Sequence, residues 1–182
     1  KDKDKIIRKA KETMEIYAPL ADRMGMNRIR DELEDLSFSV LNKPARDLIN
    51  ERLKFIKNNR DDTFKSISID LIDLLKKNGI EATIAGREKT PFSIWRKIQN
   101  KKISLEQLTD IIGFRVIVNN VEECYKALGV FHSKFSTIPG KFKDYISTPK
   151  INNYKSIHTS VIGPKKNRIE IQIRTFEMNE FA

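Results

Sequence analysis

Two acidic residues lie beside hydrophobic segments that the sequence predicts to be strands. Asp110 directly precedes the apolar residues 111–118, and Glu170 lies within 168–174, where polar and apolar residues alternate. A carboxylate at the end of a strand is a suitable ligand for Mg²⁺, which also takes oxygens from substrate phosphates. A lone Asp in this position more commonly caps the preceding helical turn, so both interpretations of Asp110 stay open. A second carboxylate on a neighbouring strand would favour the metal site.

The segment 168–174 has the alternation of a half-buried strand. Ile169, Ile171 and Ile173 fall on one face because side chains alternate with period two, and this face is predicted to meet the core. The opposite face carries four polar residues: Arg168, Glu170, Gln172 and Arg174. These side chains either face solvent or bind a ligand.

Positive charge is concentrated in two parts of the chain. The sequence has 35 Lys and Arg against 25 Asp and Glu, a net charge of +10. Residues 87–102 hold six basic and one acidic residue, and residues 141–174 hold eight basic and two acidic residues. These two segments carry all of the excess positive charge. They predict a polyanionic ligand, either a nucleotide or a nucleic acid. The alternative is two separate solvated basic surfaces.

The first basic segment resembles an anion site at the start of a helix. Arg87 follows a predicted strand, and Lys89 precedes a helix predicted to begin at Pro91. The amino end of a helix attracts phosphate, and Ser93 and Lys97 share one face of this helix. No glycine-rich run ends in Gly-Lys-Ser or Gly-Lys-Thr, which excludes a P-loop. An ordinary basic amphipathic helix explains the same spacing.

The second basic segment interleaves lysines with aromatic residues and ends at a histidine. Its members are Lys141, Phe142, Lys143, Tyr145, Lys150, Tyr154, Lys155 and His158. Aromatic rings among cations suit a nucleobase stacked above paired phosphates. Asn152 has the amide needed to read a base edge, and His158 has ring nitrogens that can bond a phosphate or a ribose hydroxyl. The alternatives are a solvated basic loop with aromatics packed on the core, and a structural histidine.

The elements expected around these residues mix helices and strands. Residues 1–60 predict helices: the first is interrupted at Pro19, a second begins near Asn27 and a third follows Asn42, while a fourth runs from Asp62 to Gly79. Further helices are predicted at 91–99 and 121–135, with a short helical piece before Asp110. Strands are predicted at 80–85, 111–118, 157–162 and 168–174, with the last two forming a hairpin after a long loop at 136–156. The fold class is therefore α+β, a mixed β-sheet flanked by helices and preceded by an all-helical N-terminal segment.

The composition excludes several classes of protein. A single cysteine, Cys124, cannot form an internal disulfide and fits the reducing cytoplasm. Two histidines and one cysteine are too few for a typical structural zinc site. No apolar run approaches the roughly 20 residues of a membrane helix, and no apolar stretch follows the charged first residues as in a signal peptide. We therefore expect a cytoplasmic protein without a membrane segment.

Six short motifs follow one another in order between residues 80 and 182. They are Gly86-Arg87-Glu88-Lys89, Phe92-Ser93-Ile94-Trp95-Arg96-Lys97, Asp110-Ile111-Ile112-Gly113-Phe114-Arg115-Val116, Pro139-Gly140-Lys141-Phe142-Lys143-Asp144-Tyr145-Ile146, the run from Asn152 to His158, and Glu170-Ile171-Gln172-Ile173-Arg174-Thr175. This series resembles the RelA/SpoT family, the stringent-response enzymes that make guanosine tetra- and pentaphosphate. Residues 15–23 and 32–36 resemble the helices that join the hydrolase and synthetase domains of that family.

The resemblance implies a domain division, a fold and a reaction. Residues 1–60 would end a hydrolase-like domain with its connecting helices, and residues 61–182 would form a nucleotidyltransferase-like synthetase domain. The reaction would be the Mg²⁺-dependent transfer of the β,γ-pyrophosphate of ATP to the 3′-hydroxyl of GDP or GTP, with AMP leaving. Asp110 and Glu170 would be catalytic and would hold the metal, with Glu170 either the second ligand or the base. ATP would be bound by Arg87, Lys89, Ser93, Lys97 and Arg115, and GDP or GTP by Lys143, Lys150, Asn152, Tyr154, His158 and Gln172.

The sequence departs from the family pattern in three places. Lys141 replaces an arginine that many relatives have, and a point charge grips phosphate less well than a forked donor. No histidine is followed by aspartate, so hydrolase activity is expected to be absent. The chain stops at Ala182, before the Ala-Ala-His-Trp motif of the family, which predicts a C-terminal truncation. Two alternatives stay open: a catalytically impaired guanine-nucleotide-binding fragment and an RNA- or ribosome-binding module. Ribosome or tRNA contacts would need regulatory regions outside these residues, and the oligomeric state is open.

Overall fold

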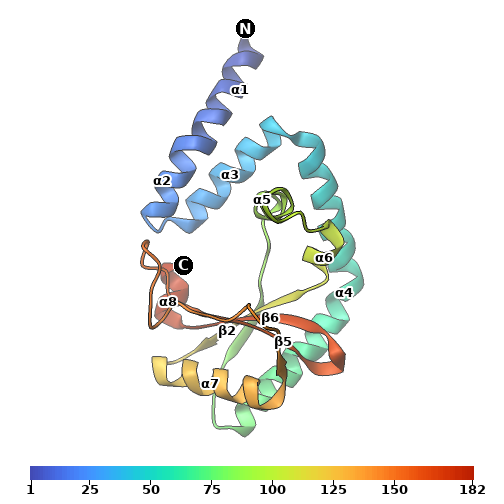
Figure 1. Ribbon diagram of the computed structural model, residues 1–182, viewed down its shortest axis with the longest axis vertical. Coiled ribbons are helices and arrows are strands. Elements are labelled where there is room, and N and C mark those ends of the chain that lie inside the picture. The colour runs from blue at the N-terminus through green and yellow to red at the C-terminus, as the bar shows by residue number, and fades with distance from the viewer. The chain divides into compact units, whose positions relative to one another are not determined.

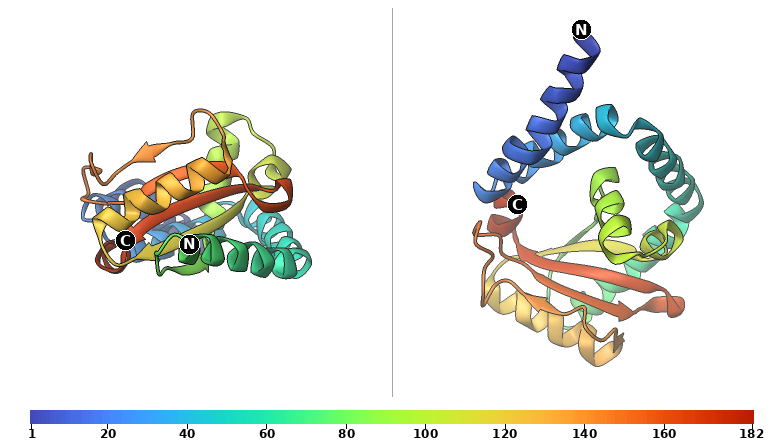
Figure 2. Two further views of the ribbon diagram at one scale, coloured as in Figure 1. Left: turned by 90° about the horizontal axis from the view of Figure 1, so that it is seen from below. Right: turned by 45° about the horizontal axis from the view of Figure 1, so that its top comes forward.

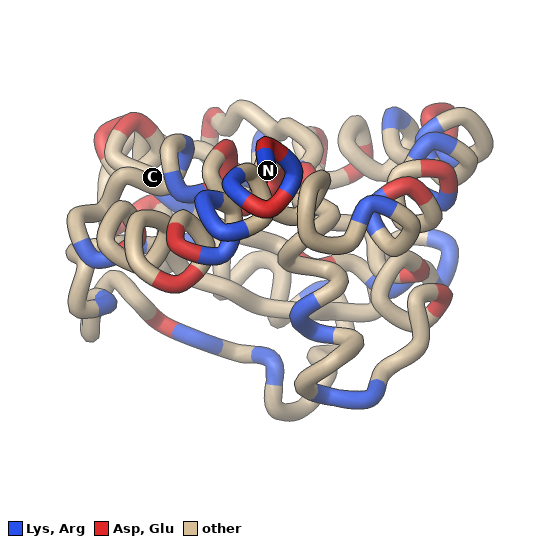
Figure 3. The backbone as a smooth tube through the Cα atoms, turned by 90° about the horizontal axis from the view of Figure 1, so that it is seen from above, with Lys and Arg blue, Asp and Glu red and all other residues tan.

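The computed structural model describes residues 1–182, which divide into two units (Figure 1). The first unit holds residues 1–58, 89–109 and 182, and the second holds residues 59–88 and 110–181. Along the helices, Lys and Arg are interleaved with Asp and Glu (Figure 3). No helix is both long enough and apolar enough to cross a membrane.

Helices make up the first unit. They are α1 (Asp2–Glu12), a π-helical turn (Thr13–Tyr17), α2 (Ala18–Arg23), α3 (Asn27–Leu41), the first part of α4 (Lys43–Lys77), α5 (Pro91–Lys101) and α6 (Leu105–Thr109). Phe38, Ile49 and Ile94 form the centre of its core. The predicted interruption at Pro19 takes the form of the π-helical turn, since proline has no N–H to donate and its ring crowds the preceding turn.

One prediction about this helical part is wrong. The third and fourth helices expected from the sequence form a single helix, α4, of 35 residues. No glycine or proline lies in the polar stretch 58–62, and the helix continues through it. The predicted cap at Asn42 is present, because its Oδ1 accepts a hydrogen bond from the backbone N–H of Ala45 at 3.4 Å.

A six-stranded mixed sheet forms the second unit (Figure 2). Its strand order is β1-β2-β6-β5-β3, with β4 also paired to β5. The β2–β6 pair is parallel and the other pairs are antiparallel. The antiparallel pairing of β5 with β6 confirms the predicted hairpin. The strands are β1 (Thr83–Gly86), β2 (Ile112–Val118), β3 (Ser136–Thr137), β4 (Lys143–Asp144), β5 (Ile157–Ile162) and β6 (Arg168–Thr175). The predicted loop at 136–156 thus contains two very short strands.

The apolar face of this sheet packs against two helices. The second part of α4 and α7 (Val121–Lys134) lie on this face, and a short helix α8 (Phe176–Phe181) follows β6 (Figure 1). Ile169, Ile171 and Ile173 are fully buried, which confirms the alternation predicted for this strand. Each such side chain contributes about 2 kcal/mol of hydrophobic stabilisation. Burial also raises the pKa of the Cys124 thiol on α7 to about 11, so this cysteine stays protonated and is no nucleophile.

Candidate nucleotide-binding and active site

The polar face of the sheet collects many of the predicted site residues. Parallel pairing places Arg115 of β2 beside Gln172 of β6, and antiparallel pairing places His158 of β5 on the other side of Gln172. Lys143 of β4 is in turn the partner of His158. Register partners point to the same side of a sheet, so four strands contribute one row of side chains. This row runs Arg115, Gln172, His158, Lys143, and it lies opposite the buried isoleucines.

Glu170 lies one row further along β6, beside Gly113 of β2. Its carboxylate accepts a hydrogen bond from the guanidinium of Arg87, and the two side chains form an ion pair that is about one quarter exposed. The backbone N–H of Arg87 donates to the carbonyl of Gly113 at 3.0 Å. A Cβ at position 113 would lie 3.1 Å from the Cβ of Arg87. A glycine here therefore gives Arg87 the space in which to approach Glu170.

Asp110 lies at the same end of the sheet as Glu170. Gly113 is the register partner of Glu170, and Asp110 precedes Gly113 by three residues. The chain between the Cα atoms of Asp110 and Gly113 therefore spans at most about 11 Å. The Asp110 side chain is 57% exposed, and its Oδ1 is 3.4 Å from the guanidinium of Arg60 on α4. The two predicted catalytic carboxylates thus come from the same end of neighbouring parallel strands, and each is paired with an arginine.

These two carboxylates fit the donor set that Mg²⁺ takes from proteins. The ion is usually held by one or two carboxylates, while water and substrate phosphates supply its other ligands. No group of three His, Cys, Asp or Glu side chains suited to a metal is present. The residues therefore fit a magnesium ion that is shared with a phosphate-bearing substrate better than an ion held by protein alone.

Two arginines of the polar face have no carboxylate partner. The Nε atoms of Arg115 and Arg174 are buried and make no hydrogen bond. Burial is the main cause that lowers the pKa of Arg174, and the charges of Arg115 and Arg87 act in the same direction. Uncompensated positive charge of this kind favours an anionic ligand.

Tyr154 lies in a cluster of aromatic and cationic side chains. Its hydroxyl oxygen is 2.8 Å from Nε2 of His158, and Nζ of Lys150 is 5.1 Å from the centre of its ring. The same Nζ is 4.9 Å from the ring centre of Tyr145, which packs edge-on against His158 at 5.3 Å. Three residues predicted to bind a guanine nucleotide, Lys150, Tyr154 and His158, are therefore brought together.

A tight turn presents Tyr154 to this cluster. Oδ1 of Asn152 accepts a hydrogen bond from the backbone N–H of Tyr154 at 3.1 Å. The backbone N–H of Lys150 donates to the carbonyl of Tyr154 at 3.1 Å, and Asn153 adopts a left-handed conformation with φ 64°. Asn tolerates this conformation better than most residues. Asn152 therefore shapes the turn, a contribution separate from the base reading predicted for it.

Asp144, which the sequence analysis did not select, anchors the loop between Lys143 and Lys150. Its Oδ1 accepts from the backbone N–H groups of Ile146 and Ser147, both at 2.9 Å. Its Oδ2 accepts from the hydroxyls of Ser147 at 2.7 Å and of Tyr125, on α7, at 2.9 Å. Burial opposes ionisation most strongly, but these hydrogen bonds together outweigh it and lower the pKa of Asp144.

We expect Asp144→Asn to lower the free energy of unfolding by about 1 kcal/mol at pH 7, because an amide accepts these bonds less strongly than a carboxylate. Since the pKa of Asp144 is lowered in the folded protein, the contribution is complete above the ordinary value of 3.8 and is lost as the pH falls below it. Urea unfolding at several pH values measures this difference. Asp70→Asn, an exposed position on α4, is the control, and equal stability of the two variants at pH 7 would contradict the role of Asp144.

Three predicted ATP residues belong to the first unit. Lys89 donates from Nζ to the carbonyl of Leu108 at 2.8 Å. Thr90 caps α5, since its Oγ1 accepts from the backbone N–H of Ser93 at 3.2 Å. Ser93 donates its own hydroxyl to the carbonyl of Thr90 at 2.9 Å, and Lys97 lies one turn further along α5. The predicted helix start at Pro91 is confirmed.

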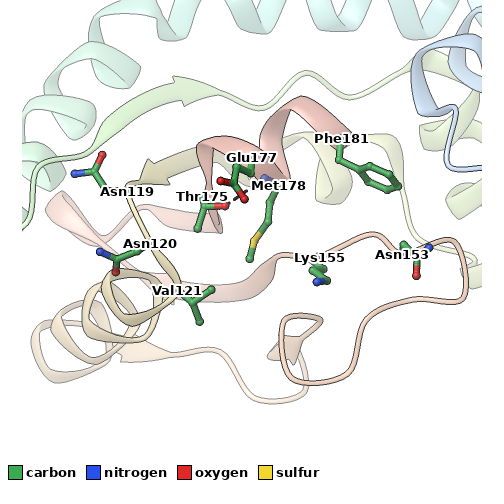
Figure 4. Close-up of a pocket in the computed structure, with 9 residues that line it drawn as sticks. All are labelled: Asn119, Asn120, Val121, Asn153, Lys155, Thr175, Glu177, Met178 and Phe181. Atoms are coloured by element: carbon green, nitrogen blue, oxygen red, sulfur yellow. Dashed lines mark hydrogen bonds between the residues drawn. The ribbon is translucent and has the colours of Figure 1, made fainter.

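A pocket of about 530 Å³ opens beside α8, near the segment that carries Tyr154 (Figure 4). Amide and charged side chains surround an apolar surface of Val121, Met178 and Phe181. The lining residues are Asn119, Asn120, Val121, Asn153, Lys155, Thr175, Glu177, Met178 and Phe181. None of these residues was predicted to bind a nucleotide. Only Lys155, a member of the second basic segment, and Asn153, within the motif from Asn152 to His158, lie in segments that the sequence singled out.

The chain is similar to several known proteins. Residues 86–182 match the sequence model of a family described as "Region found in RelA / SpoT proteins". The chain is 51% identical to GTP pyrophosphokinase rsh of Brucella melitensis over 98% of its own length and 24% of that protein. It is 49% identical to guanosine-3′,5′-bis(diphosphate) 3′-pyrophosphohydrolase of Aquifex aeolicus over 95% of its own length and 25% of that protein. It therefore spans about a quarter of the length of these curated relatives.

A solved structure shares the fold. The small alarmone synthetase 1 of Bacillus subtilis, determined bound to its product pppGpp, aligns with a TM-score of 0.54 and 26% sequence identity. The alignment covers 71% of this chain and 76% of that chain. The predicted mixed sheet flanked by helices is thus confirmed both by the structure itself and by this similarity.

Proposed function

This chain belongs to the RelA/SpoT family, and from that premise we propose that it transfers the β,γ-pyrophosphate of ATP to the 3′-hydroxyl of GDP or GTP. The relative from Brucella melitensis is named as a GTP pyrophosphokinase, and the Bacillus subtilis structure is described as a synthetase bound to pppGpp. The division expected from the resemblance, helices at 1–60 and a synthetase-like domain at 61–182, is part of this proposal.

The position of Asp110 and Glu170 carries the proposal. Both come from the same end of neighbouring parallel strands, on a sheet whose polar face holds uncompensated arginines. Acidic side chains are unfavourable beside bound phosphates unless a cation offsets them. A site that only binds RNA or phosphate has no use for this pair, whereas a Mg²⁺-dependent transfer of a phosphate group requires it.

The proposed reaction exchanges one phosphorus–oxygen bond for another. The 3′-oxygen of GDP or GTP attacks the β-phosphorus of ATP, and the bond between that phosphorus and the α,β-bridging oxygen breaks, so AMP leaves with this oxygen. Glu170 is our candidate for accepting the proton of the 3′-hydroxyl. Mg²⁺ held by Asp110 and Glu170 would neutralise phosphate charge. Positioning and charge neutralisation supply most of the acceleration of such a transfer.

The two substrates are assigned to separate groups of residues. We propose that GDP or GTP stacks on Tyr154 and that Lys143, Lys150 and His158 neutralise its phosphates, while Gln172 and Asn152 lie alongside. None of these six residues lines the pocket beside α8. For ATP we propose Arg87 and Arg115 on the sheet, with Lys89, Ser93 and Lys97 at the start of α5.

The experiment is a nucleotide assay of the chain with ATP, GDP and Mg²⁺. We expect AMP and guanosine tetraphosphate in equal amounts, and loss of both when a chelator removes the metal. Binding of GDP without any product would instead indicate a catalytically impaired nucleotide-binding fragment. RNA binding with a steep salt dependence and no nucleotide binding would indicate an RNA-binding module.

We also propose that these residues carry no hydrolase activity, since no histidine in the sequence is followed by aspartate. The relative from Aquifex aeolicus is named for the hydrolase reaction and extends well beyond the matched segment. Incubation of guanosine tetraphosphate with the chain and divalent cations is expected to release no GDP. Release at a rate above that of metal alone would overturn this part of the proposal.

A further inference from the structure

Arg174 is a buried cation that the proposed reaction uses only as part of the positive charge of the polar face. Its side chain lies on β6 and the residue is only 2% exposed. It forms no ion pair, and its Nε has no hydrogen-bond partner. Burying an arginine without a carboxylate disfavours folding, so stability gives no reason for its presence. The hydrogen bonds made by one terminal nitrogen of its guanidinium group explain its presence better.

Those contacts reach residues proposed to hold the guanine nucleotide. A terminal nitrogen of Arg174 donates to the hydroxyl oxygen of Tyr154 at 3.1 Å and also to Oε1 of Gln172. The guanidinium carbon lies 5.4 Å from the centre of the Tyr154 ring. A single side chain thus contacts both the ring and the hydroxyl of Tyr154.

Arginine can only donate hydrogen bonds, so Arg174 is the donor in its contacts with both Tyr154 and Gln172. The oxygen of Tyr154 accepts from Arg174, and the same hydroxyl is 2.8 Å from Nε2 of His158. Gln172 must turn its carbonyl oxygen toward Arg174, so its amide hydrogens point elsewhere. Arg174 therefore orients the hydroxyl oxygen of Tyr154 and the carbonyl oxygen of Gln172, and Tyr154 in turn contacts His158.

We propose that Arg174 is a positioning residue for the guanine nucleotide: it fixes Tyr154, His158 and Gln172 in one arrangement without touching the nucleotide itself. This inference rests on the proposed function, because that function assigns these three residues to GDP or GTP. It gives a role to a residue that stands in the last of the six motifs and has no assigned function there.

The first test is Arg174→Met, which keeps length but removes charge and donors. We expect GDP affinity, measured by calorimetry on the 182-residue chain, to fall about tenfold while ATP affinity is unchanged. We expect the midpoint of urea unfolding to stay equal or rise, because a methionine is easily buried. Arg168→Met, on the same strand but exposed, is the matched control and should change neither affinity. A fall in stability with unchanged GDP affinity would show a structural role and overturn the proposal.

The second test asks whether Arg174 acts through Tyr154. Tyr154→Phe removes only the hydroxyl, and we expect the double variant with Arg174→Met to bind GDP no more weakly than Arg174→Met alone. Fully additive losses would mean that the two residues act independently, against the proposal.

A third measurement separates this inference from the proposed function. If the wild-type chain makes no tetraphosphate, the function fails, but the position of Tyr154 can still be read from the ¹³C NMR spectrum of the four labelled tyrosines, without any nucleotide. The Tyr154 signal is identified as the one missing in Tyr154→Phe. We expect Arg174→Met to shift or broaden that signal and to leave the other tyrosines outside the cluster unchanged. An unchanged Tyr154 signal would show that Arg174 does not position it.

Discussion

Asp110→Ala is expected to reduce pyrophosphate transfer by about 10³-fold or more while the chain stays folded. The carboxylate is proposed to hold Mg²⁺, and losing a metal ligand removes much of the charge neutralisation on which the transfer depends. The expected cost in stability is small. Asp110 is 57% exposed and its pairing with Arg60 at 3.4 Å is a surface ion pair, worth at most about 1 kcal/mol.

Initial rates at saturating ATP and GDP, over a Mg²⁺ titration, measure this effect, and circular dichroism checks the fold. Arg60→Ala is the informative control, because it breaks the same ion pair and leaves the carboxylate in place. It is expected to keep most of the activity. If Asp110→Ala retained wild-type rates, Asp110 would have no part in holding the metal. If Arg60→Ala were equally inactive, the ion pair itself would be responsible.

Glu170→Gln is expected to have a comparable effect, about 10³-fold in kcat. The substitution keeps the size and shape of the side chain, but an amide binds a divalent cation poorly and cannot accept the substrate proton. Its neighbour Arg87 loses an ion-pair partner and keeps a hydrogen-bond acceptor. We therefore expect the fold to survive, and the loss to fall on kcat more than on the KM values of either nucleotide.

Steady-state kinetics with each nucleotide varied in turn separates these constants. Glu81→Gln is a matched control, since Glu81 is an exposed glutamate of the same unit. A wild-type kcat for Glu170→Gln would remove Glu170 from both of its proposed roles. A normal kcat combined with a raised KM for ATP would instead assign Glu170 to holding Arg87 in place.

Patterns local in the sequence predicted the elements well. The alternation of isoleucine with polar residues predicted the strand that is β6, and the apolar run 111–118 predicted β2. The exception was α4, for which two helices were predicted although no glycine or proline separates them. Charge and polarity alone did not end that helix, because exposed polar residues are compatible with a helical backbone.

Local sequence patterns could not predict how the site residues lie relative to one another. No local pattern shows that Arg115 lies beside Gln172, since this depends on which strands pair and in which register. The buried contacts of Arg174 were hidden for the same reason: in sequence it is one polar residue among four, and only the pairing of β6 and the return of the chain at Tyr154 give it partners. The roles of the site residues stay predictions until the variants are measured.

The central position of β6 has a consequence for synthesis of the protein. This strand pairs with β2 on one side and β5 on the other, and it supplies the buried isoleucines as well as Glu170, Gln172 and Arg174. During translation, β2 leaves the ribosome more than 50 residues before its parallel neighbour, so it must wait with an unpaired edge. Nucleotide binding by the nascent chain therefore begins only after β6 has emerged, in one late step, and shorter nascent chains should bind none.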